Sequence, residues 1–253
     1  MSEPSGPRPA VVVTGAAQGI GAAIAHRFAA AGHPVVGLDL DGSRLTRTAE
    51  SWPGSGHGTV VGDAAGADDV GAACELAAAT DGGLGTFVAN AGHAKAGDSL
   101  DYAAEDWDAL LRVHLTGAMV GAQQAARRMP GGGALVLMSS LNGLVGFPRR
   151  TAYGAAKAGV GGLVRGLASE WAARGLRVNG IAPGPITTEL SSEFIRRGVF
   201  DPDTFLARIP MQRFGEPAEV AELAYFLGTP AASFITGIVV PIDGGWSAQG
   251  VAD

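Results

Sequence analysis

The sequence has one cysteine, Cys74, among its 253 residues, so no disulfide can form within the chain. A reducing compartment, the cytoplasm, is therefore the expected location. Uninterrupted hydrophobic runs are also missing. The uncharged stretches 10–25 and 129–148 contain glycines and polar residues, which argues against an export signal or a membrane helix.

Charge is scarce, since charged residues make up only 17% of the chain, and the net charge is −6. An acidic chain is a poor partner for nucleic acid or for an anionic membrane surface, so a small-molecule substrate is expected. The histidines show no metal-ligand spacing, so no metal site is predicted. Residues 1–9 contain three prolines and predict a flexible tail, and residues 10–253 fit a single domain.

Glycine is abundant, and many of the 40 glycines separate short apolar runs from helical patterns. The expected strands are 10–13, 34–38, 58–61, 85–89, 134–138 and 176–181, and the expected helices are 21–31, 41–51, 67–80, 104–129 and 151–173. This alternation predicts an α/β fold, a Rossmann-type doubly wound parallel sheet of about seven strands with helices on both faces.

The first expected strand runs into a glycine-rich turn, Thr14-Gly-Ala-Ala-Gln-Gly-Ile-Gly21. Glycines let the backbone approach a diphosphate, and the N-terminus of the following helix offers free amides to it. Asp39 ends the second strand, where a carboxylate can accept hydrogen bonds from ribose hydroxyls. The segment therefore predicts dinucleotide binding.

Asp39 also discriminates between cofactors, because a 2′-phosphate would meet a like charge there. Neither Gln18 nor Leu40 is basic. Arg44 could favour NADP, but its place on the next helix makes this the weaker alternative. NAD(H) is the predicted cofactor.

Polar and glycine residues follow the expected strands. Because the carboxyl ends of parallel strands share one edge of a sheet, these residues should converge there. They are Gly15, Asp39, Asp63, Asn90, Ser140 and Pro183.

Tyr153 and Lys157 stand four residues apart in an expected helix, so their side chains share one face. A nearby ammonium favours the ionised phenol, which would give an acid/base working nearer to neutrality. The pair alone would equally fit a solvated helix face.

Together these motifs resemble the short-chain dehydrogenase/reductase family over about residues 10–246. The residues that carry the resemblance are the turn at 14–21, Asn90-Ala-Gly92, Ser140, Tyr153-x-x-x-Lys157, Pro183-Gly184 and Asp243-Gly-Gly245. The resemblance implies that Tyr153 is the catalytic acid/base and that Ser140 binds the substrate oxygen. It also implies that Lys157 holds the nicotinamide ribose and lowers the phenol pKa.

The resemblance further implies the extent of the site. The cofactor site comprises Gly15, Gln18, Gly19, Ile20, Gly21, Asp39, Leu40, Asp63, Ala64, Asn90, Ala91, Gly92, Tyr153, Lys157, Pro183, Gly184, Ile186 and Thr188. The substrate site comprises Ser140, Asn142, Phe147 and Tyr153. Residues 187–210 are expected to form a lid with two short helices, and a homotetramer is expected.

One residue departs from the family pattern, since His114 stands where the family usually has asparagine. The resemblance implies a catalytic role there, in a water relay that carries protons from Lys157 towards solvent. A histidine can donate, accept and titrate near neutrality, so it could serve that relay. The alternative is a core histidine that serves packing alone.

The leading interpretation is an NAD(H)-dependent oxidoreductase that interconverts a secondary alcohol and a ketone, on a sugar, polyol or cyclic alcohol. A 3-oxoacyl-[acyl-carrier-protein] reductase is the alternative enzyme, although that class usually favours NADPH. A non-catalytic NAD(H)-binding sensor is the alternative of another class.

Overall fold

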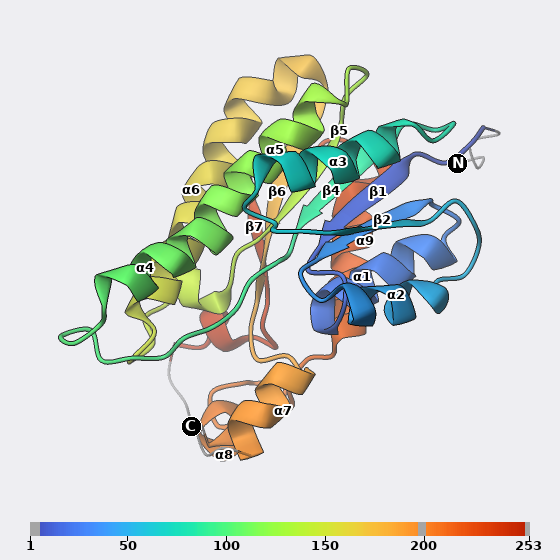
Figure 1. Cartoon of the computed structure of the whole chain (residues 1–253). Coiled ribbons are helices and arrows are strands. Elements are labelled where there is room, and N and C mark those ends of the chain that lie inside the picture. The colour runs from blue at the N-terminus through green and yellow to red at the C-terminus, as the bar shows by residue number, and fades with distance from the viewer. Residues whose placement is uncertain (1–5, 197–200, 251–253) are drawn as a thin grey trace.

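A computed structural model describes residues 6–196 and 201–250. Its centre is a seven-stranded sheet in which every pairing is parallel, with helices on both faces (Figure 1). The strands are β1 (Ala10–Thr14), β2 (Val35–Asp39), β3 (Gly58–Val61), β4 (Leu84–Ala89), β5 (Gly133–Met138), β6 (Leu176–Pro183) and β7 (Val239–Ile242). The predicted fold class is confirmed.

Helices fill the connections between strands. They are α1 (Gly19–Ala30), α2 (Gly42–Glu50), α3 (Ala67–Ala78), α4 (Ala104–Leu111), α5 (Gly117–Arg127), α6 (Thr151–Trp171), α7 (Glu189–Arg196), α8 (Pro202–Leu206) and α9 (Pro217–Gly228). Within the described part of the chain, no helix is both long and apolar enough to cross a membrane.

The strands are apolar on both sides because both faces of the sheet are covered. In β1, Val11 and Val13 pack with α1 and α9, whereas Ala10 and Val12 face the layer of α3, α5 and α6. The two hydrophobic layers explain why β1 is a continuous apolar run without polar alternation.

The strand order is β3-β2-β1-β4-β5-β6-β7. The chain adds strands on one side of β1 as far as β3, and then on its other side from β4 to β7. The direction reverses between β1 and β4, and ligands of such sheets bind beyond the carboxyl ends at this switch point. The glycine turn after β1 and the loop after β4 both lie there.

The expected helix over 104–129 is corrected by the structure. A π-helical turn, Arg112–Thr116, separates α4 from α5 and contains the buried His114. A π turn holds one more residue than an α turn, so it changes the faces that neighbouring side chains present. The local apolar periodicity does not reveal that insertion.

The C-terminal part adds α9, which begins at Pro217 with a capping box formed by Glu216 and Glu219. Helix α9 packs along α1 and covers the same face of the sheet. The sequence interpretation contained neither this helix nor bounds for β7.

Hydrogen bonds join the inner end of the expected flexible tail to the fold. His33 Nδ1 donates to the Pro9 carbonyl over 2.8 Å, and Ala10 N donates to Gly83 O over 2.7 Å. These bonds fix the chain from Pro9 onward. Residues 1–5 of that predicted tail lie outside the described residues.

Cys74 lies in α3 and is fully buried against the sheet. Burial disfavours the charged thiolate and raises the pKa of the thiol to about 12.

Candidate active site

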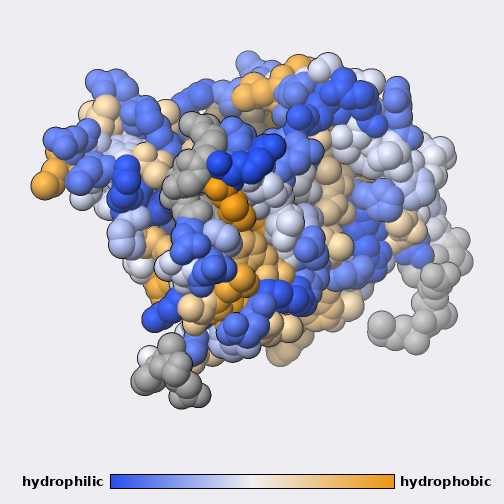
Figure 2. Space-filling view, turned by 90° about the horizontal axis from the view of Figure 1, so that it is seen from below, coloured by the Kyte–Doolittle hydropathy of each residue, from blue (hydrophilic) through white to orange (hydrophobic). Residues whose placement is uncertain are grey.

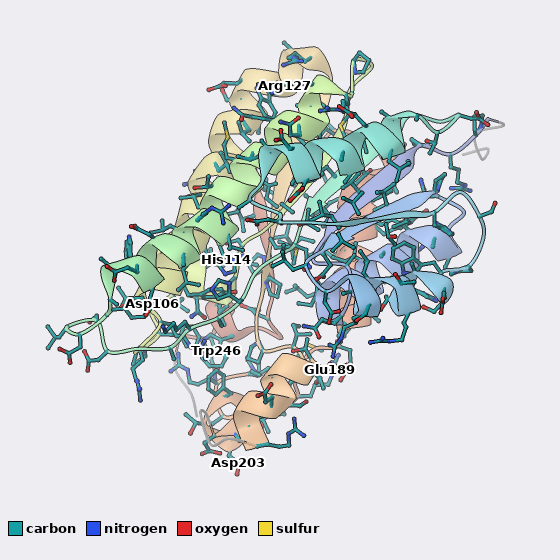
Figure 3. The ribbon with its side chains drawn as sticks, in the orientation of Figure 1. Asp106, His114, Arg127, Glu189, Asp203 and Trp246 are labelled. Carbon is teal, nitrogen blue, oxygen red and sulfur yellow. The ribbon has the colours of Figure 1, made fainter. Side chains whose placement is uncertain are left out.

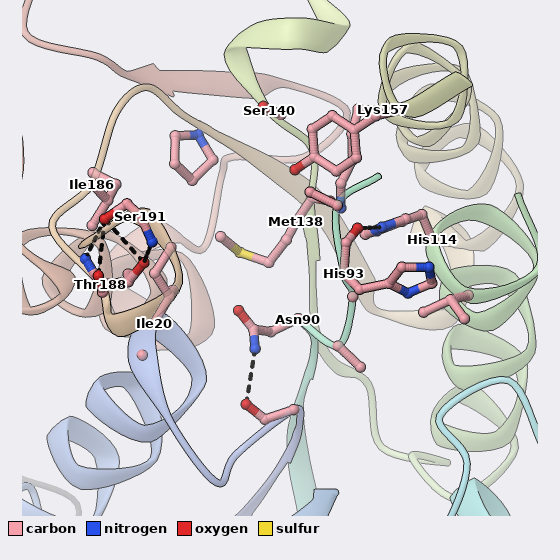
Figure 4. Close-up of a pocket in the computed structure, with 18 of the residues that line it drawn as sticks. Ile20, Asn90, His93, His114, Met138, Ser140, Lys157, Ile186, Thr188 and Ser191 are labelled. Carbon is pink, nitrogen blue, oxygen red and sulfur yellow. Dashed lines mark hydrogen bonds between the residues drawn. The ribbon is translucent and has the colours of Figure 1, made fainter. Parts of the chain in front are cut away.

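A cavity of about 510 Å³ opens at the carboxyl ends of the strands. Residues from the glycine turn, the ends of β2 to β6, helix α6 and the lid segment line it (Figure 4). Of the predicted site residues, every one except Gly21 contributes to the lining. Seen from this end, the surface carries a hydrophobic strip between hydrophilic flanks (Figure 2).

The glycine turn is shaped to receive an anion. Gly15 and Gly19 have φ values of +68° and +56°, which favour glycine. A Cβ on Gly21 would overlap the carbonyl oxygen of Gly15. Gln18 caps α1 without a side-chain hydrogen bond, so the first amides of the helix remain available to a diphosphate. The donor set therefore fits a dinucleotide.

Asp39 is held beside this turn. Its Oδ2 accepts from Ala17 N over 3.0 Å, and its Oδ1 accepts from Asp41 N over 3.1 Å. A carboxylate has further lone pairs to offer, so both bonds are compatible with ribose hydroxyls as additional donors.

Asn90 forms side-chain hydrogen bonds that the sequence did not predict. Its side-chain Nδ2 donates to Thr14 O over 3.0 Å and to Gly15 O over 3.1 Å. The Thr14 hydroxyl in turn accepts from the amides of Asn90 and Ala91, each over 3.0 Å. Asn90 therefore joins the glycine turn to the loop after β4.

Asp63 is engaged by protein groups. Its Oδ1 accepts from Ala65 N over 2.8 Å, and its Oδ2 lies 2.7 Å from Arg112 Nη2. The hydrogen bond from Ala65, helped by Arg112, holds the pKa of Asp63 below its usual range. Ala64 follows it in the cavity wall.

Lys157 is buried and its ammonium points at the end of β5. Nζ donates to Met138 O over 2.7 Å, while the Lys157 carbonyl accepts from Ser139 Oγ over 2.9 Å. Desolvation lowers the pKa of Lys157 to about 7.

Tyr153 shares the cavity with Lys157, whose Nζ lies 5.6 Å from the centre of the phenol ring. Burial raises the pKa of Tyr153, opposed by a hydrogen bond from Ser140 and by the charge of Arg150. The sequence predicted a phenol pKa lowered by the lysine. In the structure, desolvation of the phenol outweighs both of these effects, so the pKa of Tyr153 lies above its ordinary value.

His114 stands edge-on to Tyr153, with ring centres 5.1 Å apart. Its Nε2 lies 2.6 Å from His93 O, which can only accept, so Nε2 carries the proton. Its Nδ1 is buried without a partner among the described residues. Burial, together with the charge of Lys157, lowers the pKa of His114 to about 3. The expected titration near neutrality is therefore wrong.

A second cavity, of about 10 Å³, lies behind this group and contacts both His114 and Lys157. Its size is close to that of one water molecule. Thr14 also contacts it, while Gly92 allows the imidazole to approach, because a Cβ there would overlap the ring.

The segment after β6 reaches back over the cleft. Thr188 caps α7 by exchanging hydrogen bonds with Ser191, and its methyl group faces Gly19 (Figure 4). Glu189, at the start of α7, pairs with Arg44 Nη1 over 2.8 Å (Figure 3). Residues 197–200 of the predicted lid lie outside the described residues.

The remaining cavity wall is largely carbon. Asn142, Phe147, Phe205 and Phe214 line it, and Trp246 lies next to the lid helices (Figure 3). Phe205 and Phe214 in the cavity wall were not predicted from the sequence, because no motif marks them. The contacts of Thr14, His93 and Met138 were not predicted either, because these residues act through backbone or hydroxyl groups.

A protein-family model described as enoyl-(acyl carrier protein) reductase matches residues 15–247. An uncharacterised short-chain type dehydrogenase/reductase of Sinorhizobium fredii is 38% identical over 93% of this chain. The chain spans only 43% of that relative's length. The cis-4-hydroxycyclohexanecarboxylate dehydrogenase of Sinomonas cyclohexanicum is 40% identical over 94% of this chain and 96% of its own length.

A crystal structure from Agrobacterium tumefaciens, provisionally assigned as a 2-deoxy-D-gluconate 3-dehydrogenase and holding NADP, is similar in fold. Its TM-score is 0.83 at 35% identity, covering 95% of this chain and 97% of that one.

Gly21→Ala should lower NADH affinity by about tenfold or more, because the added methyl displaces the Gly15 backbone that would cradle the diphosphate. A fluorescence titration with NADH measures the change. Gly162→Ala on α6 is the matched control, since a Cβ there meets nothing within 4 Å. Equal NADH affinity in Gly21→Ala and the wild type would contradict the assigned cradle.

Proposed function

The chain belongs to the short-chain dehydrogenase/reductase family of oxidoreductases, and we propose that it interconverts a secondary alcohol and a ketone with NAD(H). The observation that carries this proposal is one cavity in which Ser140, Tyr153 and Lys157 meet the glycine turn. A cofactor held by that turn and a substrate held by Ser140 would share this space.

We propose that Tyr153 moves the proton of the substrate oxygen. In ketone reduction the phenol donates its proton to the carbonyl oxygen, and in alcohol oxidation the phenolate takes the hydroxyl proton. Ser140 orients the same oxygen by a hydrogen bond. When bound, the nicotinamide supplies or accepts the hydride, which balances the reaction. Burial raises the phenol pKa, so Tyr153 is protonated at neutral pH, which is the form that donates in ketone reduction.

Lys157 would hold the nicotinamide ribose and pass a proton back to the Tyr153 phenolate after ketone reduction. Its hydrogen bond to Met138 O keeps the ammonium inside the site. The cavity of about 10 Å³ between Lys157 and His114 is the place we propose for a relay water. His114 would accept from that water through Nδ1 while staying neutral, because its pKa is about 3.

NAD(H) is the proposed cofactor because Asp39 opposes a 2′-phosphate. Arg44, the cation that could reverse this preference, already contacts Gln18 and two carboxylates. Its Nη1 lies 2.8 Å from Glu189, and its Nε lies 3.7 Å from Asp41. The same reasoning disfavours the alternative, a 3-oxoacyl-[acyl-carrier-protein] reductase, which usually takes NADPH.

Tyr153→Phe tests the reaction. The variant should lose turnover by about 10³-fold or more, because no other group replaces the proton donor, while NADH binding stays within about twofold of the wild type. NADH absorbance with a panel of alcohols and ketones measures the rate. Substantial residual turnover would disprove the assigned acid/base. A wild type that binds NADH but turns over no member of the panel would support a non-catalytic sensor.

Asp39→Ser tests the cofactor choice. It should raise kcat/KM for NADP by about tenfold or more, since the repelling charge is gone, and lower it for NAD. Asp81→Ser is the matched control, because it removes one carboxylate at an exposed position outside the cavity wall. A wild type that prefers NADP by tenfold, about 1.4 kcal/mol, would contradict the assignment.

His114→Leu tests the relay. It should lower kcat by about tenfold to a hundredfold, because the acceptor is lost, whereas His114→Asn should retain most of the activity. Because a group with a pKa of about 3 stays neutral from pH 5 to 9, the pH–rate profile of His114→Asn should keep its shape. An unchanged kcat in His114→Leu would contradict the relay and show that His114 serves packing alone.

A further inference from the structure

Four aromatic side chains close the substrate end of the cavity, and we refer to them as the aromatic wall. Phe147 precedes α6, Phe205 lies in α8, Phe214 precedes α9, and Trp246 follows β7. The three phenylalanines line the cavity, while Trp246 packs behind them. Segments far apart in the sequence therefore contribute to one apolar surface.

The rings of the wall hold one another in place. Phe147 and Phe205 stack with centres 6.2 Å apart and planes inclined by 24°. Trp246 lies 5.4 Å from Phe147 and 5.7 Å from Phe205. Trp246 is itself only 9% exposed and packs against the fully buried Leu141 and Ile209. The wall is thus ordered before a substrate arrives, which lowers the entropy cost of binding to it.

Ser140, Asn142, Arg150 and Tyr153 are polar residues of the cavity lining, and all lie between the end of β5 and the first turn of α6. The residues that the wall itself adds to the lining are the three phenylalanines, and the Arg208 guanidinium lies 5.8 Å from the Trp246 ring centre. Phenylalanine rings offer no hydrogen-bond partner, so a substrate hydroxyl pressed against the wall would lose its water and gain nothing. A ring of CH₂ groups, in contrast, gains from the same contact.

We propose that the aromatic wall selects a carbocyclic secondary alcohol or ketone over an open-chain polyol or sugar. The reacting oxygen faces Ser140 and Tyr153, and the apolar edge of the ring packs on Phe147, Phe205 and Phe214. This inference rests on the proposed alcohol–ketone chemistry and narrows its substrate class.

A matched pair of ketones tests the wall. 4-Methylcyclohexanone and 4-hydroxycyclohexanone share the ring and the reacting carbonyl and differ only in the group directed away from it. We expect kcat/KM to favour the methyl compound by about tenfold or more, because the hydroxyl finds no partner. In the reverse direction, cyclohexanol should be oxidised about a hundredfold faster than galactitol at equal concentration. Equal or opposite preferences would overturn the proposal.

Variants of Phe205 connect the preference to the wall. Phe205→Asn should reduce the preference for the methyl compound to about threefold or less, because the amide can pair with the hydroxyl, whereas Phe205→Leu should keep it. Phe234→Asn is the control, since Phe234 is fully exposed and lies outside the cavity wall. If Phe205→Asn loses NADH binding, Phe147→Asn carries the same comparison. If a folded Phe205→Asn variant keeps the full preference for the methyl compound, the aromatic wall is not the cause of that preference.

Activity and binding measurements distinguish a failure of the aromatic-wall proposal from a failure of the proposed function. Tyr153-dependent activity on polyols, with none on cyclic substrates, would disprove the proposed selection by the aromatic wall and leave the proposed function intact. Bound NADH without turnover of any substrate in either class would disprove the proposed function, and the inference with it.

Discussion

The side-chain amide of Asn90 ties together the two central strands at the point where their carboxyl ends part. It donates hydrogen bonds to the carbonyls of Thr14 and Gly15. The Thr14 hydroxyl in turn accepts hydrogen bonds from two backbone amides of the loop after β4. These bonds set the distance between the glycine turn and the loop on which His114 rests. The cofactor cradle and the proposed proton path therefore share one support, and neither can shift without the other.

One side of the site is held by hydrogen bonds to the end of a strand, and the opposite side is built from four separate segments of the chain. Lys157 is held through its ammonium by Met138 and through its carbonyl by Ser139, so the end of β5 fixes the face of α6 that carries Tyr153 and Lys157. The opposite side gathers rings from four segments that meet only in the folded chain. Such a division is common in proteins of this architecture, where a fixed scaffold carries variable substrate loops.

The strands, the glycine turn and the shared edge of the sheet could be predicted because they depend on local patterns of apolar and glycine residues. The π turn at His114 could not, because the local apolar pattern does not mark the extra residue that such a turn contains. The protonation of Tyr153 and His114 also escaped prediction. Desolvation sets both pKa values, and desolvation depends on packing that no single stretch of sequence encodes.

The buried Cys74 has a consequence for following the molecule in solution. A thiolate is the form that reacts with alkylating reagents, and a thiol with a pKa of about 12 supplies almost none at neutral pH. Since Cys74 lies on the face of α3 that packs against the sheet, a reagent can reach it only after that helix detaches. The alkylation rate of this single thiol therefore measures how often α3 detaches from the sheet.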